Sequence, residues 1–168
     1  MGGVARFFAV VAACGFVASL VVHLIAWTGL EPPFGEAVFV LHAGIFVVWL
    51  PAVLMTQKLV RGAPRRDFWK AALRGCPQWM RTGLYILFPY VFVNFFAGML
   101  LGVEEQGTPY RMFSGHWLLF YFAGMAMLTS AANLNSRGPR KCANGHGAPP
   151  FSRFCSECGS ELPPDPIV

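Results

Sequence analysis

The chain has 168 residues, of which 55% are hydrophobic and only 12% are charged, about half the charged share of an ordinary soluble domain. Four stretches of 20 to 22 residues contain no charged side chain, and the rest of the chain has an ordinary charge density. This pattern excludes a soluble globular domain, a disordered chain and a secreted disulfide scaffold. It indicates an integral membrane protein.

The charge-free stretches are residues 7–28, 37–57, 83–102 and 115–134. About 20 helical residues cross the hydrocarbon core, and only helices or closed barrels satisfy their backbone there. The sequence therefore predicts an all-α four-transmembrane-helix bundle over residues 1–136, followed by a tail over residues 137–168. Residues 11–14, which end at Cys14, resemble a lipoprotein cleavage box. However, the apolar run between Arg6 and Cys14 is short for a signal-peptide core, and apolar residues continue after Cys14. A retained span is therefore predicted.

The loops predict an orientation. Residues 58–82 carry seven basic side chains and one acidic one, whereas the loops on either side are mainly acidic. Because basic residues in short loops stay in the cytoplasm, both termini are predicted to be cytoplasmic, at the plasma or inner membrane in a bacterium. The basic residues behind the net charge of +5 are then explained by the orientation of the spans and by attraction to anionic lipid, and no nucleic-acid partner is predicted.

Within this basic loop, residues 64–80 show the pattern of a short interfacial helix. Apolar side chains recur at helical spacing, at Phe68, Ala72, Cys76 and Trp79, and Pro77 should interrupt the helix. The opposite side is predicted to be basic and to face anionic lipid; its residues are Arg65, Arg66, Lys70 and Arg74. The alternatives are a docking element and a connector whose aromatic rings rest on the bilayer.

The tail contains the one specific motif, Cys142-x3-His146 followed by Cys155-x2-Cys158. Two short chelating loops with two soft or borderline ligands each are what a tetrahedral zinc ion requires. Gly145 and Gly159 permit the tight turns. A disulfide is the competing interpretation, and a reducing cytoplasm argues against it.

Residues 140–162 resemble a zinc-ribbon module, chiefly through Phe154-Cys155-Ser-Glu-Cys158-Gly159 and the later Leu162. The family usually has Cys-x2-Cys in both knuckles, so His146 would replace a cysteine here. The resemblance implies a structural zinc, with all four positions filled by protein. The membrane part resembles no characterised family.

Ionisable side chains inside the spans are costly and are candidates for function. His23 and His42 have the same predicted depth in the outer leaflet, and His116 and Asn94 lie in the same half of the membrane. This set is a possible intramembrane ligand site. Two imidazoles at matched depth suit haem b, a transition metal or a quinone head, whereas hydrogen bonding between helices is the structural alternative.

Pro51 and Pro89 are predicted to kink their helices at matched depth, and Gly98 with Gly102 forms a small-xxx-small pair for close helix contact. The sequence leaves open whether this pair lies inside the bundle or in a homo-oligomer.

The sequence suggests two main functions and a third alternative. The first is a non-catalytic membrane subunit or scaffold whose cytoplasmic zinc ribbon docks a protein partner, since common nucleotide-binding, hydrolase and metalloprotease motifs are absent from the sequence. The second is a redox subunit that binds haem b or a quinone through His23 and His42. Transport of a small ligand or metal is a third alternative.

Overall fold

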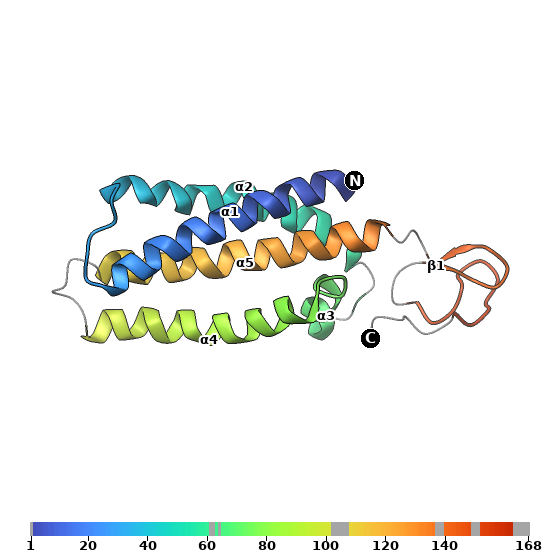
Figure 1. The fold of residues 1–168 in the computed structure, drawn as a ribbon. Helices are drawn as coiled ribbons and strands as arrows, with labels where there is room; N and C mark the ends of the chain where they lie inside the picture. Colours follow the sequence, from blue (N-terminus) through green and yellow to red (C-terminus); the bar gives the residue numbers. More distant parts are fainter. Residues whose placement is uncertain are drawn as a thin grey trace.

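The structure is a computed structural model that describes residues 2–60, 63, 65–101, 108–136, 140–148 and 152–162. Its long helices are α1 (Gly2–Trp27), α2 (Val40–Leu59), α4 (Gln78–Leu101) and α5 (Thr108–Ser136). They run up and down in one bundle (Figure 1). All four are long and apolar enough to cross a membrane, so the four predicted spans are confirmed as candidate membrane-crossing helices.

The bundle has two ends that are used below as reference points. The N-terminus, the start of α4 and the end of α5 lie at one end, here called the tail end (Figure 1). The end of α1 and the starts of α2 and α5 lie at the other, here called the distal end. Gly29, with a φ of 75°, follows the last turn of α1 there, and its amide donates to Ala26 O at 3.2 Å. The left-handed conformation that glycine permits thus ends the helix. A short 3-10 helix, η1 (Gly35–Phe39), leads into α2.

Helix α5 is the centre of the bundle. In its membrane-length window 67% of the residues are buried, against 17 to 22% in the other three helices. The largest fully buried side chains include Trp117, Met127 and Leu128, all on α5. The other helices instead expose large apolar side chains, such as Phe46, Ile86 and Leu100. A hydrocarbon solvent is the environment that suits such a surface.

Glycines on the surrounding helices make room for the large side chains of α5. A Cβ on Gly15 of α1 would lie 2.3 Å from Cε1 of Tyr121, and a Cβ on Gly44 of α2 would lie 2.3 Å from its hydroxyl. The Tyr121 hydroxyl donates to Leu41 O at 2.8 Å. Gly98 of α4 meets Met112 of α5 in the same way, so this half of the small-xxx-small pair faces the inside of the bundle. Its second member, Gly102, lies outside the described residues.

The segment predicted as one surface helix over residues 64–80 is broken into pieces. It comprises a 3-10 turn, η2 (Arg65–Asp67), a short helix, α3 (Phe68–Ala72), and a non-helical stretch before α4 begins just after Pro77. The stretch is held on α5, because Gly75 N donates to Ser130 Oγ and Asn133 Nδ2 donates to Gly75 O, both at 2.9 Å. Hydrogen bonds to α5 therefore replace those of a continued helix.

This break corrects the predicted basic face. Arg65, Arg66 and Lys70 are exposed, and Asp67 lies 3.6 Å from Arg66 and 3.3 Å from Lys70. Arg74 is only 9% exposed, because helix α3 has ended and the chain has turned onto α5. Three of the four predicted basic residues thus remain available to a charged lipid surface.

Candidate metal centre and intramembrane polar cluster

The first half of the tail is a hairpin that carries Cys142 and His146. Strand β1 (Arg140–Lys141) pairs antiparallel with β2 (Gly147–Ala148). Between the strands, Cys142 N donates to His146 O at 3.0 Å and Gly145 N donates to Cys142 O at 2.9 Å. Gly145 has a φ of 82°, so the turn needs the conformation that glycine allows. The hairpin places both side chains on one side of the turn.

The second half repeats this arrangement with Cys155 and Cys158. Phe154 and Glu161 form an antiparallel bridge, and Cys155 N donates to Ser160 O at 2.9 Å. Gly159, with a φ of 69°, closes the turn by donating its amide to Cys155 O. The predicted use of Gly145 and Gly159 in tight turns is confirmed.

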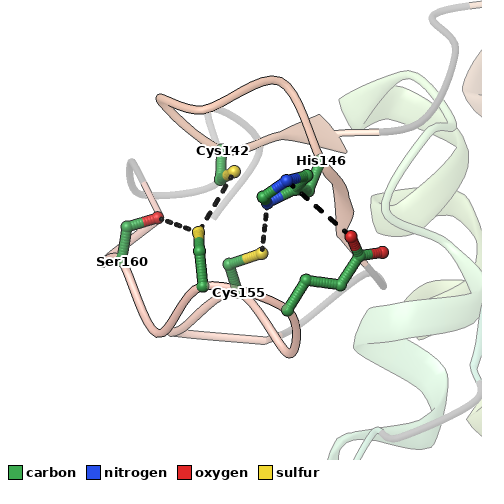
Figure 2. Close-up of polar contacts among 6 residues, drawn as sticks. Cys142, His146, Cys155 and Ser160 are labelled. Carbon is green, nitrogen blue, oxygen red and sulfur yellow. Dashed lines mark hydrogen bonds and ion pairs between the residues drawn. The ribbon is translucent and has the colours of Figure 1, made fainter.

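The two turns bring their four side chains to one point. The ligand atoms of Cys142, His146, Cys155 and Cys158 all lie within 4.8 Å of one another. The Cys142 and Cys158 sulfurs are 3.7 Å apart, and Cys155 Sγ is 3.8 Å from His146 Nδ1 (Figure 2). Zinc–sulfur bonds of about 2.3 Å in a tetrahedron separate two sulfurs by about 3.8 Å. The cluster therefore has the donor set and the spacing of a four-coordinate metal site.

The electrostatics of the cluster also suit a cation. Hydrogen bonds from the Ser160 hydroxyl and amide, together with His146, lower the pKa of Cys158 to about 5. The pKa of Cys155 is raised: backbone hydrogen bonds lower it, but burial and the neighbouring thiols of Cys158 and Cys142 outweigh them. Despite burial, backbone hydrogen bonds also lower the pKa of Cys142, so Cys155 is the thiol whose ionisation is disfavoured. A divalent cation removes this conflict, because metal-bound thiols are deprotonated.

His146 has a second partner on the side away from the sulfurs. Its Nε2 lies 3.8 Å from Oε2 of Glu157, while Nδ1 faces Cys155. A carboxylate behind a ligating imidazole orients the ring and increases its basicity. Nδ1 is therefore the ring nitrogen that faces the thiols.

His23 lies in a polar cluster that joins three helices near the distal end. It is 3% exposed, and its Nδ1 is 2.7 Å from Ser114 Oγ of α5. Its Nε2 is 2.5 Å from Tyr90 Oη of α4 and accepts from Trp27 Nε1 at 3.1 Å. Asn94 joins the same cluster, because its Nδ2 donates to Arg111 O at 3.0 Å. His23 and Asn94 are thus linked through Ser114 and Arg111 of α5.

The other two histidines have separate partners. His42 Nδ1 accepts a hydrogen bond from Trp117 Nε1 at 3.1 Å, and His42 itself is exposed. His116 Nδ1 donates to Met112 O at 3.1 Å, and its ring contacts Phe95 edge-on. The three histidines thus contact different residues of α5, which are Ser114, Trp117 and Met112.

This arrangement gives no support to a haem held by His23 and His42. Both ring nitrogens of His23 already have hydrogen-bond partners, whereas an axial ligand must offer one nitrogen to iron. His42 is bonded to a different α5 residue, Trp117. Hydrogen bonding between helices, the structural alternative, accounts for the observed contacts.

Sequence analysis missed four members of the cluster, which are Trp27, Tyr90, Arg111 and Ser114. Trp27 could be identified from the sequence in principle, because it lies one helical turn after His23 on the same face. Ser114 and Tyr90 lie 91 and 67 residues from His23 in sequence, so only the packing of α1 and α4 on α5 identifies them.

Comparison with known proteins gives no relative for either cluster. No family model matches the chain, and neither a curated protein nor a solved structure is significantly similar to it.

Proposed function

We propose that this protein is a non-catalytic membrane subunit or scaffold whose tail binds a structural zinc ion and docks a protein partner. The observation that carries the proposal is the convergence of three thiols and one imidazole within 4.8 Å. Every position of a tetrahedral ion is then filled by protein, which is typical of structural sites and leaves no position for a substrate. The paired hairpin turns support the zinc-ribbon resemblance of residues 140–162.

Folding of the tail is expected to depend on the metal. In the described part of the tail, the core consists of Cys142, Ala148, Cys155 and Leu162, two of which are themselves ligands. So small a core cannot offset the conformational entropy of the tail. Metal binding is therefore proposed to supply the free energy of folding.

The surface of the tail supports docking to a protein. Phe154 is 59% exposed although it forms a bridge beside the metal cluster. Its neighbours Arg153, Glu157 and Glu161 are exposed charges of both signs. An exposed aromatic side chain with a mixed polar rim is typical of a protein contact, whereas nucleic-acid surfaces are strongly basic.

We further infer that the tail end faces the cytoplasm. The exposed basic residues Arg65, Arg66 and Lys70 belong to the segment that precedes α4 at this end, and the tail leaves α5 there (Figure 1). Basic residues in short loops favour this orientation. The same residues, beside the exposed aromatic rings of Phe68 and Trp69, are suited to contact anionic lipid.

Metal analysis of the full-length protein tests the zinc site. One zinc per chain is expected, and cobalt substitution should give the visible absorption of a tetrahedral thiolate-rich site. Cys155→Ser should remove the metal, whereas Cys14→Ser, which changes a cysteine on α1, should not. Stoichiometric zinc retained in Cys155→Ser would contradict the assignment.

Docking is tested by photo-crosslinking in cells from a residue beside Phe154. A photoreactive side chain at position 153 is expected to give a discrete product, which Phe154→Ala and Cys155→Ser should both weaken. The matched control carries the same group at Phe34, which is exposed at the distal end. A product insensitive to both substitutions would contradict docking through the folded tail.

A further inference from the structure

The hydrogen bonds of the His23 cluster have a defined direction. Trp27 Nε1 can only donate, so the His23 Nε2 that it contacts at 3.1 Å is an acceptor and the imidazole is neutral. His23 Nδ1–H must then donate to Ser114 Oγ at 2.7 Å, and the Ser114 hydroxyl donates to Arg111 O at 3.2 Å. The Tyr90 hydroxyl donates to the same Nε2 at 2.5 Å. The protons of Tyr90, His23 and Ser114 therefore all point inward, toward Arg111 O.

This series of hydrogen bonds ends at an atom that cannot pass a proton on. Arg111 O is a backbone carbonyl, which accepts from Ser114 and also from Asn94 Nδ2. A proton path across the bundle would need a further group that both accepts and donates. The direction and the end point of this series of hydrogen bonds thus argue against a proton relay across the bundle.

The opposite end of this series of hydrogen bonds lies at the surface of the bundle. Tyr90 is 36% exposed and Trp27 is 54% exposed, whereas His23 behind them is 3% exposed. The proton of Tyr90 is used on His23, so its oxygen has only acceptor capacity left. Trp27 Nε1 contacts that oxygen at 3.2 Å, and the second lone pair has no partner within the described part of the chain.

The two aromatic rings are held in place beside this acceptor. The guanidinium of Arg111 lies 4.6 Å from the centre of the Trp27 ring, a cation–π contact that fixes the ring. Tyr90 is held through its short bond to His23. The lipid-facing edge of the cluster therefore presents rigid aromatic surface and one hydrogen-bond acceptor.

We propose that this edge, formed by Tyr90 and Trp27, binds the hydroxylated aromatic ring of a membrane-dissolved quinol. The ring contacts the exposed aromatic side chains, and one hydroxyl donates to Tyr90 Oη. Such a molecule reaches the site through the bilayer and supplies the donor that the oxygen lacks. The site does not involve His42 and does not depend on the metal tail, so it stands or falls separately from the docking function.

Equilibrium binding of duroquinol tests the proposal. The full-length protein in phosphatidylcholine nanodiscs is dialysed anaerobically against duroquinol, and uptake by empty nanodiscs is subtracted. Saturable binding of one molecule per chain is expected. Duroquinone has the same carbon skeleton in the quinonoid form and only acceptor oxygens, so it should bind about tenfold more weakly, the value of roughly one hydrogen bond.

Matched variants locate the site. Tyr90→Phe should weaken duroquinol binding about tenfold, because it removes the acceptor. Tyr85→Phe is the control: Tyr85 lies on the same helix, is 74% exposed and belongs to no cluster. Trp27→Ala leaves the Tyr90–His23 bond in place and should weaken binding several-fold, which keeps the test valid even where Tyr90→Phe fails to fold.

Several results would overturn the proposal. These are uptake no greater than that of empty nanodiscs, equal affinity for duroquinone, or unchanged binding in both Tyr90→Phe and Trp27→Ala. Loss of duroquinol binding when phosphatidylglycerol is added to the nanodiscs would assign the acceptor to a lipid hydroxyl instead.

Discussion

The two histidine-containing clusters of this protein are assembled in opposite ways. In the tail, four ligands lie within 17 consecutive residues, and two glycine-closed turns bring them together. Around His23, the partners come from three helices and are up to 91 residues away. The first cluster has a small core, and we propose that it folds only with a bound cation, whereas the second is held by the packing of the helices. The comparison teaches that local chelation and long-range packing are separate supports, which can be removed separately.

Removal of the metal should have the largest effect and should be confined to the tail. Structural zinc contributes about 10–16 kcal/mol of binding free energy in small modules, more than the tail core can replace. A chelator should therefore abolish protection from hydrogen exchange over residues 140–162 and leave α5 unchanged. Hydrogen exchange with mass spectrometry measures both regions, and protection in the tail that survives complete metal removal would break the proposed distinction.

Substitution of Gly44 should affect the bundle alone. A Cβ there would meet the Tyr121 hydroxyl, so Gly44→Ala should lower the stability of the bundle by about 1–3 kcal/mol, a typical cost of overpacking. Tyr121→Phe removes the hydroxyl and should restore part of this loss, which thermal denaturation of the single and double variants can measure. Gly3→Ala, where no atom lies within 4 Å, is the control. Equal effects at both glycines, or release of the metal, would contradict the packing argument.

Gly75→Ala should release the segment before α4 at a similar cost. Its Cβ would lie 2.6 Å from Ser130 O, which belongs to the backbone and cannot move away as a side chain can. Cys76 is 4% exposed, and burial raises the pKa of its thiol, so it should react slowly with maleimide in the native protein. The substitution should speed this reaction several-fold, and Cys76 labelling that stays slow would show that the segment does not depend on its contact with α5.

The smallest effect is expected for the Trp117–His42 contact. Trp117→Phe keeps a ring at a fully buried position and removes one hydrogen bond, so a loss of about 1 kcal/mol is expected. Neither the native protein nor this variant should show a Soret band. A Soret band that disappears in His23→Ala would instead restore the haem hypothesis.

Composition and spacing alone determined several features of this protein. The absence of charge over about 20 residues predicts a membrane helix whatever its neighbours, because the lipid itself is the partner. The Cys/His spacing predicts the metal cluster because its ligands are held by turns of a few residues. Gly145 and Gly159 were identified for the same local reason.

Only the tertiary structure decided which helix is central and what each buried polar side chain contacts. All four spans are uniformly apolar, so no periodicity distinguishes α5 from α1, and the depth of His42 says nothing of the side it faces. The interfacial helix is predicted from its period but ends early, and the backbone of Gly75 is instead hydrogen-bonded to Ser130 and Asn133 on α5. Contacts between helices depend on the rotation and order of the helices in the bundle, and no local pattern in the sequence encodes either of these.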